Sequence, residues 1–401
     1  MTIENLFLLY RNRLTHIMSE AELFLGDFME ILIPNVSYIT WQMLVMWVIG
    51  GLLIYLAIEK DMEPTLLLPM GFGAILVNLP VAVPDSGVQH VLGTLFSIGI
   101  EGAELFPLML FIGIGAMIDF QPLLTNPKLM IFGAAAQFGI FFTLALASLL
   151  GYDLRDAASI AIIGAADGPT SIFVATELGS NYLGAIMVAA YSYMALVPLI
   201  QPPIIKLCTT KAERKIRMQY QGKPVSKTTK ILFPMIVTVI VGIVAPDAVA
   251  LIGFLMFGNL IRECGVLDSL SETAQKVLAN LITIFLGITI ASQMKAAYFL
   301  QMDTLIIIGL GLVAFIFDTV GGILVAKMMN LFSKEKINPM IGAAGISAFP
   351  MSARVVHKMG LYEDKQNFLL MHSIGVNVSG QIASVIAGGL ILALVKARIG
   401  G

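Results

Sequence analysis

Apolar segments long enough to cross a lipid bilayer follow one another along almost the whole chain. A spanning helix needs about 20 mostly apolar residues, and only 12% of the 401 residues are charged, about half of the fraction typical of soluble domains. Because the bilayer interior offers backbone groups no water, such segments must form helices. The sequence therefore predicts an all-α, polytopic membrane protein. The expected segments are 38–58, 65–83, 91–117, 129–150, 157–175, 181–205, 230–244, 248–262, 276–294, 303–331, 339–356 and 367–395.

A basic loop divides these segments into two groups. Between Lys206 and Lys230 the chain is rich in Lys and Arg, and Glu213 is the one acidic residue. A short loop of this charge stays in the cytoplasm under the positive-inside rule. The start of the chain lacks the pattern of a cleaved signal peptide and is expected to form a surface helix. The predicted divisions are an N-terminal surface segment (1–37), a first membrane half (38–205), a basic cytoplasmic loop (206–230) and a second membrane half (231–401).

Short motifs recur in the same order in the two halves. Small residues are common at helix-packing positions in membranes, so one match alone is weak. Three matches in register indicate an internal repeat. Interrupted segments at corresponding places in two repeats point to a transport site between them. The paired motifs are residues 72–73 and 257–258, 111–114 and 285–288, and 163–166 and 341–344.

A carboxylate, Asp167, stands inside the apolar run 162–171. A charge at the centre of a membrane helix costs roughly 2.5–3.5 kcal/mol on insertion scales, so it is rarely there without a function. Gly168 and Pro169 follow directly and interrupt the helix, which frees backbone carbonyls. A carboxylate with free carbonyls is a hard oxygen site suited to Na⁺ or a proton. Alternatively, Asp167 caps a helix that begins at Pro169, and both roles can hold together.

The second interrupted segment, 338–354, carries no carboxylate but offers Asn338, Ser347 and Arg354. If the tips of the two interrupted segments meet, Ser347 would lie near Asp167 and its hydroxyl would help to complete an oxygen shell. Arg354 could instead extend its side chain to the membrane surface.

Two further polar residues, Tyr193 and Asn377, follow the interrupted segments inside apolar helices. Such residues either bond neighbouring helices or line a polar site, and the pattern leaves both interpretations open. The sequence contains no P-loop, serine elbow or His-rich metal motif, and Cys208 and Cys264 have no metal-binding spacing. ATP is therefore not expected to drive this protein directly.

The motifs 164–170 and 338–354 resemble those of the membrane β subunits of the Na⁺-pumping, biotin-dependent decarboxylases, which act on oxaloacetate, glutaconyl-CoA, methylmalonyl-CoA or malonate. Asn259, residues 262–265 and the helix of Asn377 also resemble this family, over roughly residues 40–395. The resemblance implies two inverted repeats with interrupted helices, split into a scaffold and a moving, elevator-like transport part. It also implies a multi-pass protein of the bacterial cytoplasmic (inner) membrane.

The resemblance further implies a reaction shared among subunits. A carboxyltransferase subunit moves a carboxyl group onto biotin, which a biotin carrier subunit holds. The β subunit, in a homo-oligomer and with small membrane subunits, then decarboxylates this N-carboxybiotin. The step consumes a proton and exports Na⁺. Carboxybiotin is therefore expected as a supplied cofactor that is not covalently attached to this chain.

The resemblance carries over to individual residues. Asp167 resembles the essential sodium and proton carboxylate, and Arg354 is the candidate for the carboxybiotin carboxylate because a guanidinium suits a planar anion. Both are candidate catalytic residues. The candidate Na⁺ ligands are Asp167, Tyr193, Ser347 and Asn377, and the candidate cofactor-binding residues are Asn338, Gly342 and Arg354.

Two other classes of protein are compatible with parts of the sequence. A Na⁺-coupled organic-anion transporter of similar two-repeat architecture would use the same Asp167 site without breaking a bond. A structural membrane anchor for a soluble enzyme would not explain a carboxylate inside the membrane. Co-purification of a biotin-bearing subunit distinguishes the pump from the transporter.

Overall fold

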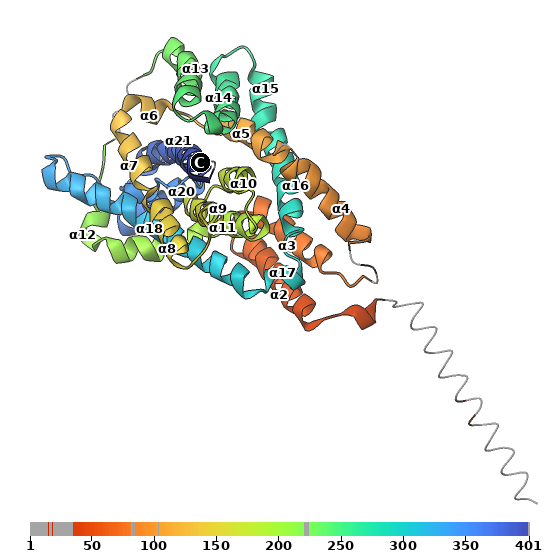
Figure 1. The fold of residues 1–401 in the computed structure, drawn as a ribbon. Helices are drawn as coiled ribbons and strands as arrows, with labels where there is room; N and C mark the ends of the chain where they lie inside the picture. Colours follow the sequence, from red (N-terminus) through yellow and green to blue (C-terminus); the bar gives the residue numbers. More distant parts are fainter. Residues whose placement is uncertain are drawn as a thin grey trace, which may run out of the picture.

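The described part of the chain is a bundle of helices without strands (Figure 1). The computed structural model describes residues 35–81, 83, 85–102, 104–219 and 224–399, together with Thr15 and Met18. Within it, 7 helices are long and apolar enough to cross a membrane, or 8 if one bent pair counts as a span. The predicted all-α, polytopic architecture is confirmed. The predicted surface segment 1–37 lies almost entirely outside the described residues.

The first half contains long apolar helices and a pair of short helices that meet at Asp167. The helix pair Gly87–Glu101 and Leu105–Met117, whose second member is α5, is bent by 63°. The elements are η1 (Val36–Tyr38), α2 (Trp41–Glu59), α3 (Pro64–Val77), α4 (Gly87–Phe96), η2 (Ser97–Glu101), α5 (Leu105–Met117), α6 (Gln121–Thr125), η3 (Pro127–Leu129), α7 (Met130–Ala135), α8 (Phe138–Leu149), α9 (Leu154–Ala161), η4 (Ile162–Ala165), α10 (Gly168–Glu177), α11 (Leu183–Cys208) and α12 (Lys211–Arg214).

The second half also contains long helices and one interrupted segment. Both halves also contain one π-helical segment, η2 and η6, within an apolar stretch. The elements are α13 (Lys227–Val244), η5 (Pro246–Ala248), α14 (Val249–Glu263), α15 (Asp268–Glu272), η6 (Thr273–Leu278), α16 (Ala279–Ala291), α17 (Ala296–Phe299), α18 (Met302–Phe332), α19 (Met340–Ala343), α20 (Met351–Glu363) and α21 (Leu370–Ile399).

The helices of the two halves pack against each other reciprocally. Helix α3 packs on α16 while α14 packs on α5, and α11 packs on α18 while α21 packs on α7. Each half therefore supplies equivalent surfaces to the other, which is what two related repeats would give. Inverted orientation of the repeats and their division into a scaffold and an elevator-like part stay predictions.

The two segments that the sequence predicts to be interrupted are broken in the structure. Segment 157–175 becomes α9, η4 and α10, and segment 339–356 becomes α19 and α20. Two other expected segments with internal glycines, 65–83 and 248–262, give short but continuous helices of 14 and 15 residues, α3 and α14.

Local backbone chemistry explains the first interruption. Residues Ile162–Ala165 tighten into a 3-10 turn, and Ala166 then adopts a left-handed conformation at φ +50°. Asp167 is extended, and α10 begins at the next residue with Pro169 in its first turn. Proline lacks the N–H that a continuing helix would need. The chain therefore reverses at Ala166 and Asp167, and α9, η4 and α10 form what we call the first hairpin (residues 154–177).

Candidate functional site

The tips of the two interrupted segments meet inside the bundle. The second of them, residues 338–363, contains α19 and α20 and is called the second hairpin here. The backbone N–H of Ser347 in its tip donates to the carbonyl oxygen of Ala165 in the first hairpin, at 2.9 Å. The Ser347 hydroxyl donates to the carbonyl of Gly380 on α21, at 3.1 Å. The predicted meeting of the two tips is thus present, with α21 as a third wall.

Asp167 is buried in this meeting place, with 3% of its surface exposed. Its Oδ2 accepts hydrogen bonds from Thr170 Oγ1 at 2.7 Å, Gln381 Nε2 at 2.9 Å and Ser384 Oγ at 3.3 Å. All three donors are neutral. Asp167 also occupies the N-cap position of α10, but its side chain makes no capping hydrogen bond there. The structure therefore shows the polar surroundings of the carboxylate and not the capping bond that the sequence offered as an alternative.

One face of α21 supplies the polar contacts to both tips. Asn377, Gln381 and Ser384 follow one another at the i, i+4, i+7 spacing that places residues on one side of a helix. Asn377 Nδ2 donates to the carbonyls of Ala344 at 3.1 Å and Ile346 at 2.7 Å in the second tip. Its Oδ1 is buried and has no hydrogen-bond partner among the described residues. An unpaired buried acceptor is costly, so this oxygen is available to a ligand.

Two tyrosines of α11 take different roles near the site. The hydroxyl of Tyr193, a candidate ligand from the sequence, donates to the carbonyl of Ile308 on α18. Tyr191 is completely buried, and its hydroxyl has no partner among the described residues. Its ring lies against Gly168, where an added Cβ would be only 2.2 Å from the ring. Tyr191 rather than Tyr193 therefore packs on the residue that follows Asp167.

The other residues of the second motif lie away from its tip. Asn338 Nδ2 donates to the carbonyls of Arg214 and Ile216 in the basic loop, both at 2.9 Å. Gly342 lies against Gly322 of α18 so closely that a Cβ would be 2.1 Å from the Gly322 oxygen. Arg354 is exposed on α20. The structure thus spreads Asn338, Gly342 and Arg354 along the second hairpin and does not gather them at Asp167.

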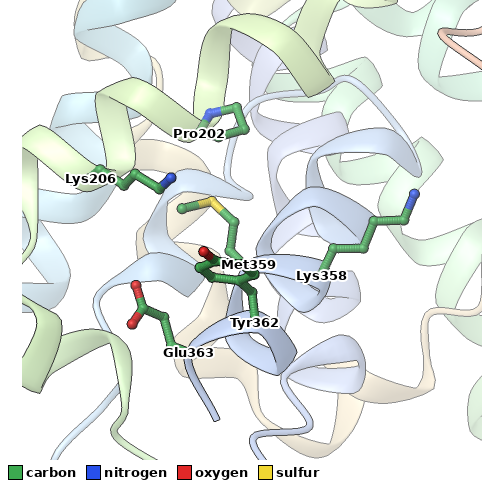
Figure 2. Close-up of a pocket in the computed structure, with 6 residues that line it drawn as sticks. All are labelled: Pro202, Lys206, Lys358, Met359, Tyr362 and Glu363. Carbon is green, nitrogen blue, oxygen red and sulfur yellow. The ribbon is translucent and has the colours of Figure 1, made fainter. Parts of the chain in front are cut away.

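A pocket of about 200 Å³ lies between α11 and α20, at the end of the bundle that carries the basic loop. Figure 2 shows Lys206 of α11 on one side of this space and Tyr362 and Glu363 of α20 on the other. The Lys206 ammonium lies 5.9 Å from the centre of the Tyr362 ring. Glu363 is paired with Arg214 at 2.7 Å. The Lys206 ammonium lies on the Tyr362 side of the pocket, whereas that of Lys358 is directed away from it (Figure 2).

Several residues at Asp167 were not singled out from the sequence. Thr170 lies within the motif 164–170, but the sequence did not suggest a role for it. Tyr191, Gln381 and Ser384 were not predicted to lie at the site. The i, i+4, i+7 spacing of polar residues on the otherwise apolar α21 was the available signal for the last two. For Tyr191 no local signal exists, because its place depends on how α11 packs against the first hairpin.

The oxygen chemistry of the site fits a hard monovalent ion. It offers a carboxylate, hydroxyls, an unpaired amide oxygen and the backbone of two interrupted tips, whereas softer transition metals favour thiolate and imidazole ligands. No group of three or more His, Cys, Asp or Glu that could hold a metal occurs among the residues that the structure describes. The residues present therefore fit Na⁺.

These features define a class: a polytopic helical membrane protein whose interrupted helices enclose a carboxylate, as in ion-translocating proteins. The family model of the β subunit of Na⁺-transporting oxaloacetate decarboxylase matches residues 42–395. The glutaconyl-CoA decarboxylase β subunit of Acidaminococcus fermentans is 50% identical, over 90% of this chain and 95% of its own. The methylmalonyl-CoA decarboxylase β subunit of Propionigenium modestum is 48% identical (88% and 94%). The oxaloacetate decarboxylase β chain of Haemophilus ducreyi is 44% identical (91% and 98%).

The chain therefore belongs to the family of β subunits of the Na⁺-transporting decarboxylases. The family resemblance inferred from the motifs is confirmed. The protein is a multi-pass membrane protein of bacteria and a subunit of a Na⁺-translocating decarboxylase.

Proposed function

We propose that this chain decarboxylates N-carboxybiotin, which a partner subunit carries, and couples that step to Na⁺ export with consumption of a proton. The family accounts for Na⁺ transport and decarboxylation. The observation that carries the finer proposal is Asp167, which is buried between two interrupted hairpins and accepts hydrogen bonds from three neutral side chains. A buried carboxylate without a paired cation is unfavourable unless a proton or a metal ion neutralises it. Exchange of a proton for Na⁺ at the Asp167 carboxylate would link proton entry to Na⁺ release.

The proposed Na⁺ ligands are Asp167, Ser347, Asn377 and Tyr193. Ser347 is supported by the bond between its N–H and the first hairpin, and Asn377 by its unpaired Oδ1. Tyr193 is the weakest member, because its hydroxyl already donates to Ile308. A hydroxyl that donates can still offer its lone pairs to a cation.

We propose that Arg354 receives the carboxylate of carboxybiotin. Arg354 is exposed, and its guanidinium interacts electrostatically with the Glu63 carboxylate without forming one of the ion pairs found among the described residues. A planar guanidinium suits a planar anion. Lys358 and Tyr362 follow at i+4 and i+8 on α20, so the three lie on one side of this helix. Tyr362 and Lys358 line the pocket of Figure 2. This row would lead an anion from the basic-loop end of the bundle toward the second tip.

Asn338 and Gly342 would support this path by holding the second hairpin in place. Asn338 fastens the base of the hairpin to the basic loop, and Gly342 allows its backbone to contact α18. The partners that the proposal requires are a carboxyltransferase subunit, a biotin carrier subunit and small membrane subunits, with more than one copy of this chain. The description of the relatives as β subunits supports an assembly of this kind.

The test uses the purified complex reconstituted in liposomes and supplied with N-carboxybiotin. Asp167→Asn should insert normally but lose both ²²Na⁺ transport and Na⁺-stimulated CO₂ release. Asp303→Asn, at an exposed carboxylate of α18, is the matched control and should keep both. Na⁺-stimulated turnover near the wild-type level in Asp167→Asn would refute the proposal. Transport of an intact organic anion without CO₂ release would favour the symporter alternative.

A second experiment tests the role of Arg354. Arg354→Ala should raise the carboxybiotin concentration needed for half-maximal turnover and leave the half-maximal Na⁺ concentration unchanged. Arg354→Lys retains charge but lacks the planar fork, so it should recover only part of the loss. Equal use of carboxybiotin by all three proteins would place the anion elsewhere.

A further inference from the structure

A second carboxylate, Asp318 of α18, is completely buried inside the bundle and takes no part in the site around Asp167. Its Oδ1 accepts the backbone N–H of Gly139 at 2.5 Å and of Ile140 at 3.2 Å. These N–H groups belong to the first turn of α8, just after the break that separates α7 from α8. Asp318, a residue of α18, therefore caps the N-terminus of the neighbouring helix α8.

The second oxygen of this carboxylate faces the first hairpin. Oδ2 is buried and has no hydrogen-bond partner among the described residues. A Cβ added at Gly164 would lie 2.8 Å from Oδ2, so no side chain separates the oxygen from the backbone of the 3-10 turn that leads to Asp167. Gly164 thus allows the hairpin backbone to approach the carboxylate directly.

A capping role alone does not explain a carboxylate at this position. Asn, Ser or Thr would accept the same N–H groups without a charge, whereas an ionised carboxylate buried without a partner costs several kcal/mol. None of the ion pairs found among the described residues involves Asp318. The unpaired Oδ2 is therefore the feature that requires a ligand.

A further unpaired oxygen lies on the same surface. Thr143 follows Gly139 by four residues, so it lies on the face of α8 that packs on α18. Its side chain is fully buried, and its Oγ1 has no hydrogen-bond partner among the described residues. A hydroxyl, a carboxylate oxygen and the backbone of a 3-10 turn are ligands that a hard cation accepts.

We propose that Asp318 binds Na⁺ through Oδ2 at the junction of α8, α18 and the first hairpin, separately from Asp167. The ion neutralises the buried carboxylate while Oδ1 keeps the cap on α8. Because the turn Ile162–Ala165 touches this site and continues into Asp167, occupation of either site acts on the same short segment. Na⁺ at Asp318 would therefore influence where the first hairpin places Asp167.

The test is Asp318→Asn in the full complex, because the Asn oxygen can still accept both N–H groups of α8. Folded yield and unfolding temperature should stay near wild type. The number of ²²Na⁺ ions bound per chain should fall by one, and the Na⁺ concentration for half-maximal CO₂ release should rise by about 10-fold or more, as is common for lost metal ligands and their supports. An unchanged ²²Na⁺ count and Na⁺ dependence would overturn the proposal and leave Asp318 as a neutral cap.

Two further variants keep the result interpretable. Asp167→Asn, measured in parallel, separates the Asp318 proposal from the proposed function of Asp167. If Asp167→Asn loses Na⁺ dependence while Asp318→Asn behaves as the wild type, only the Asp318 site is refuted. If Asp318→Asn does not accumulate, Thr143→Val preserves the cap and the volume and removes one oxygen. It should raise the half-maximal Na⁺ concentration, and a wild-type value would overturn the proposal.

Discussion

The contact between Gly168 and Tyr191 gives a quantitative test of how the Asp167 site is held. An alanine Cβ at position 168 would lie 2.2 Å from the Tyr191 ring, about 1.3 Å short of the ~3.5 Å separation of carbon atoms in contact. Tyr191 is fully buried, so its ring cannot swing into solvent. Overpacking of this kind costs about 1–3 kcal/mol. We therefore expect Gly168→Ala to reduce the free energy of unfolding by that amount and to disturb the residue next to Asp167.

A double-mutant cycle separates this clash from a general defect. Tyr191→Leu alone should destabilise the protein by leaving a cavity, but combined with Gly168→Ala it also removes the clash. The double variant should therefore be more stable than the sum of the single effects predicts, by roughly 0.5–3 kcal/mol. Unfolding of the purified protein and Na⁺-stimulated CO₂ release by the complex are measured for all four proteins. Tyr191→Phe is the control for the hydroxyl, which has no partner among the described residues, and should unfold near the wild-type temperature.

Two outcomes would contradict this reasoning. If Gly168→Ala unfolds and turns over as the wild type does, the ring of Tyr191 is not packed on the tip. If the two substitutions are additive, the loss of stability in Gly168→Ala comes from the helix start rather than from Tyr191.

The remaining predictions concern the second hairpin and Asp364, the residue that follows it. Gly342→Ala should prevent accumulation of folded protein, because its Cβ would lie 2.1 Å from the backbone oxygen of Gly322, which cannot rotate away; Gly309→Ala, with nothing within 4 Å, is the matched control for folded yield. The hydrogen bond from Arg217 to Asp364, at 2.6 Å, lowers the pKa of the Asp364 carboxyl. Its stabilising effect should be present above pH ~4, the ordinary range of an unfolded Asp, and disappear as the pH falls through the lower pKa of the folded state. The difference in unfolding temperature between wild type and Asp364→Asn, followed from pH 7 to 3, measures this loss.

The centre of the site could be predicted because its signal is local. A carboxylate followed by Gly168 and Pro169 in an apolar run predicts both a buried acidic group and the break in the helix without any tertiary information. That Asp167 binds an ion stays a prediction. The recurrence of residues 163–166 at 341–344 then indicates that two such breaks meet. The bond between Ser347 and Ala165 realises this expectation.

The choice between Tyr191 and Tyr193 could not be predicted in the same way. The two residues lie about 200° apart around one helix, and both neighbourhoods are apolar in sequence. Only the packing of α11 decides that Tyr191 faces Gly168 while Tyr193 faces α18. Asp318 is a comparable case, since an isolated carboxylate in a long apolar helix does not reveal that it caps α8.

The basic loop also has a structural role that its charge does not reveal. Arg214 and Ile216 present backbone carbonyls to Asn338, and Arg214 pairs with Glu363 at the other end of the second hairpin. Carbonyl acceptors leave no sequence pattern, so the charge of the loop indicates topology alone. Its contacts in addition fasten both ends of the second hairpin.

The first hairpin, unlike the second, is contacted by two buried carboxylates. Its turn has Asp167 on one side, bonded by the polar face of α21, and Asp318 against its backbone on the other. Both carboxylates are buried, so a change of ligand at either alters the charge next to the same few residues. The second hairpin, fastened at its base and exposing Arg354, has no carboxylate at its tip. Under the functions proposed above, the first hairpin would respond to cations and the second to the anionic carboxybiotin.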